Sequence, residues 1–158
     1  MTTRILGIDP GLVHTGVVSI VVDPENKQFT HVPYVVAGLA VDEIVDIAAA
    51  VTPDKVFIEA YRPRSHFDND ARMGAAVNEL RRRIPHARAL NNTGVKQVVT
   101  QELMQLLHLW KFTHRTNHQD LRSAARIALF GMLKDEELNQ LLTTIVIDSL
   151  DGNPWNIA

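Results

Sequence analysis

Three carboxylates lie where the chain passes from one expected element to the next. Asp9 and Glu59 each close a short apolar stretch, and Asp120 follows a polar run and opens an apolar helical pattern. Strand ends and helix starts are where open α/β sheets place their sites. Carboxylate oxygens suit hard divalent cations such as Mg²⁺, and a pair of these ions about 4 Å apart activates water against a phosphodiester. The chemistry that these residues favour is metal-dependent phosphodiester cleavage.

Each of these carboxylates also has a purely structural interpretation. Asp9 precedes Pro10 and Gly11 and suits a turn. Glu59 suits the hydrogen-bonded end of a strand, and Asp120 suits a helix N-cap. Spacing along the chain does not by itself decide between these alternatives.

The distribution of charge favours nucleic acid as the partner. The formal net charge is only −2. Residues 60–134 carry 13 basic and 5 acidic side chains, net +8, and the remaining residues carry 3 basic and 13 acidic ones, net −10. A basic middle in an acidic envelope predicts a phosphate-binding face, with an ordinary solvated surface as the alternative.

Length and composition narrow the class of protein. The 158 residues predict one domain over 1–158, with its core in 4–133 and a C-terminal helix and short tail in 134–158. The absence of cysteine excludes disulfides, thiol catalysis and Cys-ligated metal sites. The apolar runs are strand-sized and no signal-peptide pattern opens the chain, so we expect a cytoplasmic protein without membrane contact.

Hydrophobic periodicity predicts the elements that position the carboxylates. Three strands should come first, followed by helix, strand, helix, strand and helices, which is an α/β pattern with a mixed sheet. Pro33 suggests that the third strand lies at an edge, and Asp135 suits the N-cap of the last helix, with Glu136 and Glu137 in its first turn. The expected strands are 4–9, 15–22, 29–37, 55–59 and 87–90, and the expected helices are 40–51, 69–83, 99–110, 121–132 and one after 135.

The order of the motifs resembles the RuvC family of Holliday-junction resolvases. The run ILGIDPG at 5–11, with Thr15 and Gly16 after it, resembles the opening of that family. The runs VFIE at 56–59, GVKQVV at 94–99 and DLRSAARIAL at 120–129 resemble its second acidic strand, its basic helix start and its final acidic helix. The resemblance spans residues 4–130. It implies a ribonuclease H-like fold, with a five-stranded mixed sheet of three antiparallel then two parallel strands flanked by helices.

The resemblance also implies an activity and its residues. It implies a homodimer that cleaves four-way DNA junctions in recombination and repair, with one or two Mg²⁺ or Mn²⁺ ions per subunit and no nucleotide cofactor. Asp9, Glu59 and Asp120 become metal ligands and catalytic residues. Lys96 becomes a catalytic, phosphate-contacting lysine, with a solvated helix-start lysine as the alternative. The short chain resembles the phage-encoded branch, which implies a bacterial or phage-infected cell.

The last motif departs from the family pattern. The family carries two metal-binding groups three residues apart on this helix. One alignment makes Asp120 the first group and Ser123 the second, and the other makes Asn117 the first and Asp120 the second. Either alignment loses one acidic ligand, which predicts weaker metal binding. His118 is a candidate to replace the missing metal ligand, with an exposed loop histidine as the alternative.

Further residues are expected to contact DNA. The loop after Glu59 mixes aromatic and basic side chains, which suit stacking on unpaired bases and binding of phosphates. Packing of Tyr61 against the sheet edge is the alternative for that residue. The arginines at 81–83 suit general phosphate contacts or a solvated helix end. The predicted DNA-binding set is Tyr61, Arg62, Arg64, Phe67, Lys96, Arg115 and Arg122.

A stripe of small and apolar residues on helix 69–83 is a candidate dimer face. It contains Ala71, Ala75, Ala76 and Leu80, and a core-facing stripe is the equal alternative.

Three other functions compete with junction resolution. A phosphotransferase of the actin and sugar-kinase type has a similar phosphate loop but needs two duplicated domains. A broader flap, branched-DNA or ribonuclease H-type nuclease of the same fold is an alternative. A junction-binding protein that has lost its chemistry is another.

Overall fold

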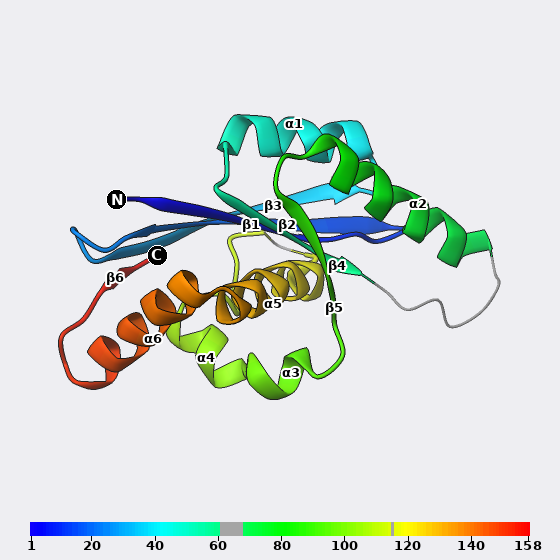
Figure 1. Cartoon of the computed structure of the whole chain (residues 1–158). Coiled ribbons are helices and arrows are strands. Elements are labelled where there is room, and N and C mark those ends of the chain that lie inside the picture. The colour runs from blue at the N-terminus through cyan, green and yellow to red at the C-terminus, as the bar shows by residue number, and fades with distance from the viewer. Residues whose placement is uncertain (61–67, 115) are drawn as a thin grey trace.

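The computed structural model describes residues 1–60, 68–114 and 116–158, and in this part of the chain six strands form one mixed sheet (Figure 1). Their spatial order is β5-β4-β1-β2-β3-β6. The strands β1 to β3 are antiparallel, whereas β4, β5 and β6 each run parallel to the strand they join. The bounds are β1 Thr3–Asp9, β2 His14–Asp23, β3 Gln28–Ala37, β4 Lys55–Ala60, β5 Ala87–Asn91 and β6 Asn156–Ile157.

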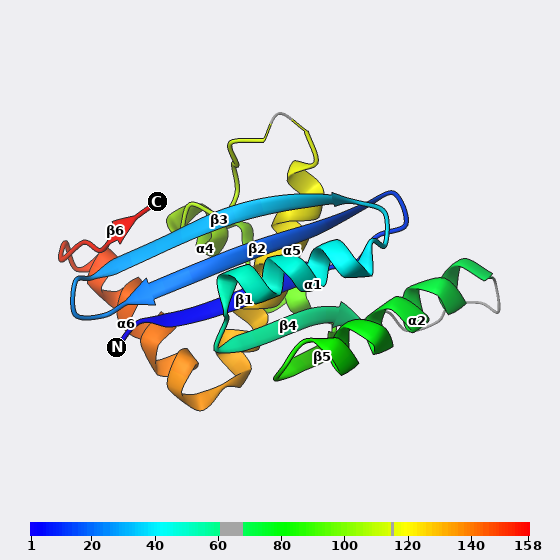
Figure 2. The same cartoon turned by 90° about the horizontal axis from the view of Figure 1, so that it is seen from above.

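Helices cover both faces of the sheet. The helices α1 and α2 lie on one face, and α5 crosses the other face with α3, α4 and α6 beside it (Figures 1 and 2). The bounds are α1 Val41–Val51, α2 Asp68–Arg83, α3 Val95–Val98, α4 Gln101–Leu106, α5 His118–Lys134 and α6 Glu136–Leu150. Among the described residues no helix combines the length and the apolar character needed to cross a membrane.

The two faces of β1 belong to two separate cores. Ile5 packs into the core on the α5 side, while Leu6 and Ile8 pack into the core beneath α1 and α2. Successive strand residues point to opposite faces. Gly7 and Asp9 therefore face α5.

Strand register brings the ends of β1 and β4 to one edge of the sheet. In the antiparallel pair Asp9 lies opposite Gly16. In the parallel pair Ile8 lies opposite Ile58, so Asp9 and Glu59 each follow the last paired residues. Parallel neighbours lie about 4.8 Å apart, which places the two backbones side by side.

Two glycines let α5 approach the centre of the sheet. A Cβ on Gly7 would overlap the carbonyl oxygen of Ala124 and the side chain of Ala128. A Cβ on Gly16 would overlap the carbonyl oxygen of Asp120. Small residues on both sides of this contact permit close backbone packing. This contact positions the start of α5 beside the end of β1.

The predicted fold class is confirmed, although the strand count differs. The five predicted strands are present, and β6 adds two residues to the edge of β3. Trp155 is buried before β6 and its Nε1 donates to Asp148 Oδ2 at 2.8 Å. So short a strand leaves no periodic pattern, which is why the sequence did not predict it.

The predicted helix over 99–110 is wrong. Within this segment the only helix is α4, which begins after Thr100, and Thr100 Oγ1 caps it by accepting from the Leu103 N–H; α3 has already ended at Val98. The helix ends at Leu106, so Trp110 lies beyond it. The apolar spacing reflects burial of Val99 and Leu107 rather than one continuous helix. By contrast, Asp135 caps α6 as predicted, with Glu136 and Glu137 in its first turn.

Candidate active site

Asp9 is the last residue of β1 and is only 7% exposed. Alternation along β1 directs its side chain to the α5 face, and its partner across β2 is Gly16. Because Gly16 also abuts the Asp120 backbone, the two carboxylate-bearing residues lie on either side of one glycine.

Glu59 lies next to the end of β4 and is half-buried. Phe57 belongs to the core on the α5 side, so alternation turns Glu59 to that same face. Its Oε1 accepts a hydrogen bond from Asn92 Nδ2 at 2.9 Å. The amide of Asn92 therefore orients the carboxylate, a role for Asn92 that the sequence did not indicate.

Asp120 is the third residue of α5, and its proposed role as N-cap is wrong. Asn117 occupies the N-cap in a left-handed conformation, with φ of 62°, and its Nδ2 donates to Thr116 Oγ1. Asp120 lies in the first helical turn, where the helix dipole favours a negative charge. Its half-buried side chain is thus available for a role other than capping.

Two pockets flank the carboxylates. A pocket of about 590 Å³ is lined by Asp120, residues 10–14 and part of α2. A second, of about 380 Å³, is lined by Glu59, Ser123, Lys96 and Arg126. Ser123 therefore shares a pocket with Glu59, whereas Asn117 lies outside α5 and lines neither pocket. The geometry favours the alignment in which Asp120 and Ser123 are the two groups on this helix.

The three carboxylates are of the chemical type that a hard divalent cation binds, but they do not surround a preformed metal site. Asp9, Glu59 and Asp120 supply carboxylate oxygens on the α5 face of the sheet. Among the side chains that the structure describes, no three of His, Cys, Asp or Glu are gathered closely enough to hold a metal ion. Mg²⁺ uses one or two carboxylates and completes its shell with water and phosphate. The residues therefore fit Mg²⁺ as a partly hydrated ion.

Arg126 is a charged residue of this site that the sequence analysis missed. It lies one turn after Ser123 on α5, and its Nε donates to the Val99 carbonyl oxygen at 3.3 Å. Burial lowers the pKa of its guanidinium, and the Glu59 charge opposes that shift. Arg126 follows Ser123 by three residues, and this spacing places both on the same face of a helix. That spacing is the sequence signal that could have identified Arg126.

Of the predicted DNA-binding residues, one binds another part of the protein, one is exposed, and the others lie outside the residues that the structure describes. Arg122 donates from Nε to the Trp110 carbonyl oxygen at 2.7 Å and stacks on the Trp110 ring. Lys96 is exposed at the second pocket, as either interpretation of it requires. The remaining predicted DNA contacts lie outside the described residues: Tyr61, Arg62, Arg64, Phe67 and Arg115.

His118 is not the exposed loop histidine that was the alternative to a metal ligand. It is the half-buried first residue of α5. Its Nδ1 accepts from the Phe112 N–H at 3.4 Å, and its Nε2 lies 2.5 Å from the His114 carbonyl oxygen. Both ring nitrogens hold the preceding loop, so neither is offered to a metal.

The apolar stripe on α2 is partly a core-facing surface and partly exposed, as a dimer face would be. Ala76 and Leu80 are buried in the core region, whereas Ala71 and Ala75 are exposed. The buried pair is core and the exposed pair remains available to a partner.

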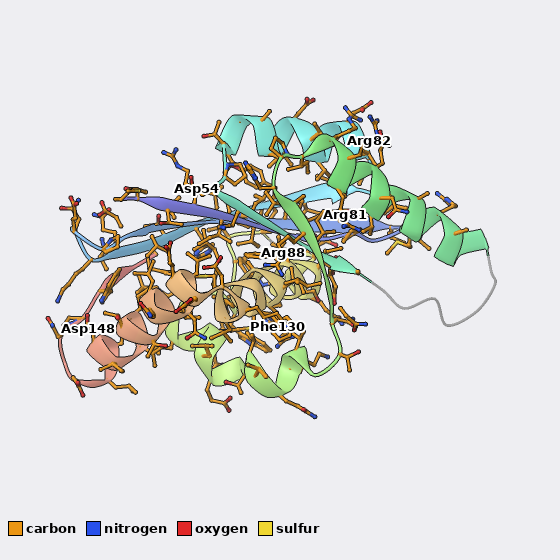
Figure 3. The ribbon with its side chains drawn as sticks, viewed as in Figure 1. Asp54, Arg81, Arg82, Arg88, Phe130 and Asp148 are labelled. Atoms are coloured by element: carbon orange, nitrogen blue, oxygen red, sulfur yellow. The ribbon has the colours of Figure 1, made fainter. Side chains whose placement is uncertain are left out.

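The arginines at the end of α2 are partly paired on the surface. Arg82 binds Glu79 and Arg83 binds Asp42. Figure 3 shows Arg81 and Arg82 on α2 and Arg88 on β5. The surface pairs favour the solvated helix end over specific phosphate contacts for Arg82 and Arg83.

Comparison with solved structures finds this fold in junction resolvases. The structure of T. thermophilus RuvC in complex with Holliday junction substrate has a TM-score of 0.61 and 16% identity, covering 80% of this chain and 90% of that one. The yeast mitochondrial Holliday junction resolvase Ydc2 has a TM-score of 0.58 and 14% identity, covering 90% and 82%. The Fowlpox virus resolvase in complex with Holliday junction DNA has a TM-score of 0.52 and 11% identity, covering 89% and 99%.

No protein-family model and no curated protein matches the chain. The structural likeness confirms the predicted ribonuclease H-like fold, shared with RuvC and with the poxvirus and yeast mitochondrial resolvases.

Proposed function

We propose that this protein is a structure-specific DNA endonuclease that resolves four-way junctions by metal-dependent phosphodiester hydrolysis. One observation carries the proposal. The backbone of Asp120 abuts Gly16, which lies opposite Asp9, at the same sheet edge where Glu59 precedes the last residue of β4. Three carboxylates from distant parts of the chain thereby share one face of the sheet, in a fold seen in resolvases bound to junction DNA.

The proposed roles follow from the position of each side chain. Asp9, Glu59 and Asp120 hold one or two Mg²⁺ or Mn²⁺ ions, with Ser123 as a neutral ligand or a ligand through water. When bound, such an ion lowers the pKa of a water and polarises the phosphate. Lys96, exposed at the pocket beside Glu59, donates to a phosphate oxygen and offsets the charge that develops there. We expect ends with 5′-phosphate and 3′-hydroxyl groups.

The substrate favours a symmetric assembly. A four-way junction has approximate two-fold symmetry, so a C2 homodimer presents two sites to two opposed strands. We propose that residues 1–158 act as one nuclease domain within such a dimer. The exposed Ala71 and Ala75 on α2 are the candidate contact.

A junction-binding protein without nuclease activity is the second candidate. Ser123 is neutral, and the described carboxylates are not gathered into a three-ligand site. Both observations favour weak metal binding.

Cleavage of defined substrates tests the proposal. The protein is incubated with end-labelled four-way junction, duplex, single strand and flap, in Mg²⁺, Mn²⁺ or EDTA. Asp9→Asn and Asp120→Asn are compared with Asp46→Asn, an exposed carboxylate on α1 at the opposite face. We expect paired metal-dependent nicks near the branch point, lost in the first two variants and retained in the third.

The other outcomes separate the alternatives. Equal cleavage of flaps and single strands would replace junction resolution with a broader nuclease activity. Binding of the junction without cleavage in either metal would favour the second candidate. Cleavage that survives Asp9→Asn would overturn the assigned site.

A further inference from the structure

The pocket beside Glu59 has a net positive charge. Glu59, Lys96 and Arg126 line this space of about 380 Å³. One carboxylate faces two cations there, so the three charges sum to about +1 at neutral pH. A monoanion that entered the pocket would balance that charge, and a DNA phosphodiester is such an anion.

Arg126 is held in place without being neutralised. Its Nε donates to the Val99 carbonyl oxygen, which fixes the side chain against the segment between α3 and α4. Across the described chain, the ion pairs do not include Arg126, and its hydrogen bond to Val99 is its only one. The terminal nitrogens of the guanidinium thus keep their donors for another acceptor.

Glu59 is not the acceptor for the terminal nitrogens of Arg126, although it lines the same pocket. Its Oε1 accepts from Asn92 instead, and no ion pair joins it to Arg126. Glu59 nevertheless raises the pKa of the Arg126 guanidinium against the larger lowering effect of burial. The two charges therefore attract each other across the pocket without making contact.

A half-buried cation without an ion-pair partner costs folding free energy, because its hydration is lost and only partly replaced. An arginine stays charged in such a place. Its planar fork of donors matches phosphate oxygens in geometry. The arrangement is therefore costly in the free protein and favourable once an anion is bound.

We propose that Arg126 is a DNA-binding residue that, together with Lys96, grips one backbone phosphate in the pocket beside Glu59. The identity of the ligand as DNA rests on the proposed function. A phosphate bound in this pocket lies next to Glu59, so Arg126 would help to set the register of the strand at the proposed site. Loss of Arg126 should weaken binding of any DNA sequence. Fewer counterions should then be released from the DNA when the protein binds.

Binding measured without cleavage tests this role. The probe is a fluorescein-labelled immobile four-way junction in EDTA, titrated at several salt concentrations. The variants are Arg126→Gln and Arg126→Lys, with Arg4→Gln as control. Arg4 is an exposed arginine at the opposite end of β1. Melting temperatures of all proteins identify any variant that fails to fold.

We expect Arg126→Gln to weaken binding roughly ten-fold and to reduce the slope of log K against log salt by about 0.9, the value of one phosphate contact. Arg126→Lys should recover most of the slope. Arg4→Gln should leave it unchanged. A purely structural Arg126 would change the melting temperature and leave the salt slope at the wild-type value, which would overturn the proposal.

The outcome is separable from that of the proposed function. If the wild-type protein binds the junction and never cleaves it, a reduced slope in Arg126→Gln still supports the phosphate contact. If the wild-type protein cleaves the junction and Arg126→Gln leaves the salt slope unchanged, the proposed endonuclease activity is supported and the proposed role of Arg126 is wrong.

Discussion

The carbonyl oxygen of Asp120 lies so close to Gly16 that a Cβ on residue 16 would overlap it. Gly16 is also the partner of Asp9 across the first strand pair. The distance between two proposed metal ligands is therefore set by the absence of one side chain. This relationship connects the packing of α5 to the chemistry at the edge of the sheet.

Replacing Gly16 with alanine should push α5 away from β2. Overpacking of this kind costs about 1–3 kcal/mol, and the displaced Asp120 should reduce junction cleavage by more than ten-fold. Urea unfolding and initial nicking rates measure the two effects. Gly74→Ala is the matched control for stability, because no described atom lies within 4 Å of a Cβ there and the substitution favours helix. Wild-type stability and wild-type nicking rates in the Gly16 variant would contradict the close contact.

Removing the Asn92 side chain should leave Glu59 without its orienting donor. Outer-shell partners of metal ligands typically contribute 10–100-fold to affinity or activity. We expect Asn92→Ala to need about ten-fold more Mn²⁺ for half-maximal cleavage, with unfolding free energy within about 0.5 kcal/mol of wild type. Exposed Asn153 is the control position, replaced by alanine. An unchanged metal dependence would show that Glu59 needs no such support.

Asp135 should make stability depend on pH at the acid end. The Leu138 N–H holds the pKa of this carboxyl below its ordinary value of 3.8, and Lys55 adds to the effect. Because the folded-state pKa is the lower one, the stabilisation is complete above 3.8 and is lost as pH falls through the folded value. Asn caps helices about as well as Asp but carries no charge.

The Asp135→Asn variant measures that contribution. We expect it to be less stable than wild type by a few tenths of a kcal/mol at pH 7. The difference should shrink as the pH falls below 3.8, as followed by urea unfolding between pH 7 and pH 3. A difference that is constant over this range would mean that the charge of Asp135 makes no contribution.

Trp155 should hold β6 against the sheet. The residue is 6% exposed, its Nε1 donates to Asp148, and the following residues pair with β3. Trp155→Ala should cost about 3–5 kcal/mol and expose the His31 amide, which donates to the Ala158 carbonyl oxygen. Trp155→Phe keeps most of the packing and should cost less. Unchanged hydrogen exchange at His31 in the alanine variant would show that β6 is held without this ring.

Local patterns in the sequence determined the elements and the candidate ligands. The short apolar run before Pro10 and the Val, Ile and Thr content after it sufficed for the first strands, and Asp135 followed by Glu136 and Glu137 sufficed for a helix cap. Such signals involve neighbours along the chain, so propensity and periodicity detect them. The end of α4 at Leu106 was missed because buried residues beyond it, such as Leu107, continue the same apolar spacing.

Only the tertiary structure decided which residues meet. Asp9 and Glu59 face α5 because strand register and alternation turn them there, and the backbone of Asp120 lies against Gly16 because two glycines admit the helix. The same packing placed Ser123 and Arg126 in one pocket with Glu59 and left Asn117 outside it. These contacts join residues far apart in the chain. Their geometry comes from how the sheet and α5 pack together, which no local preference encodes.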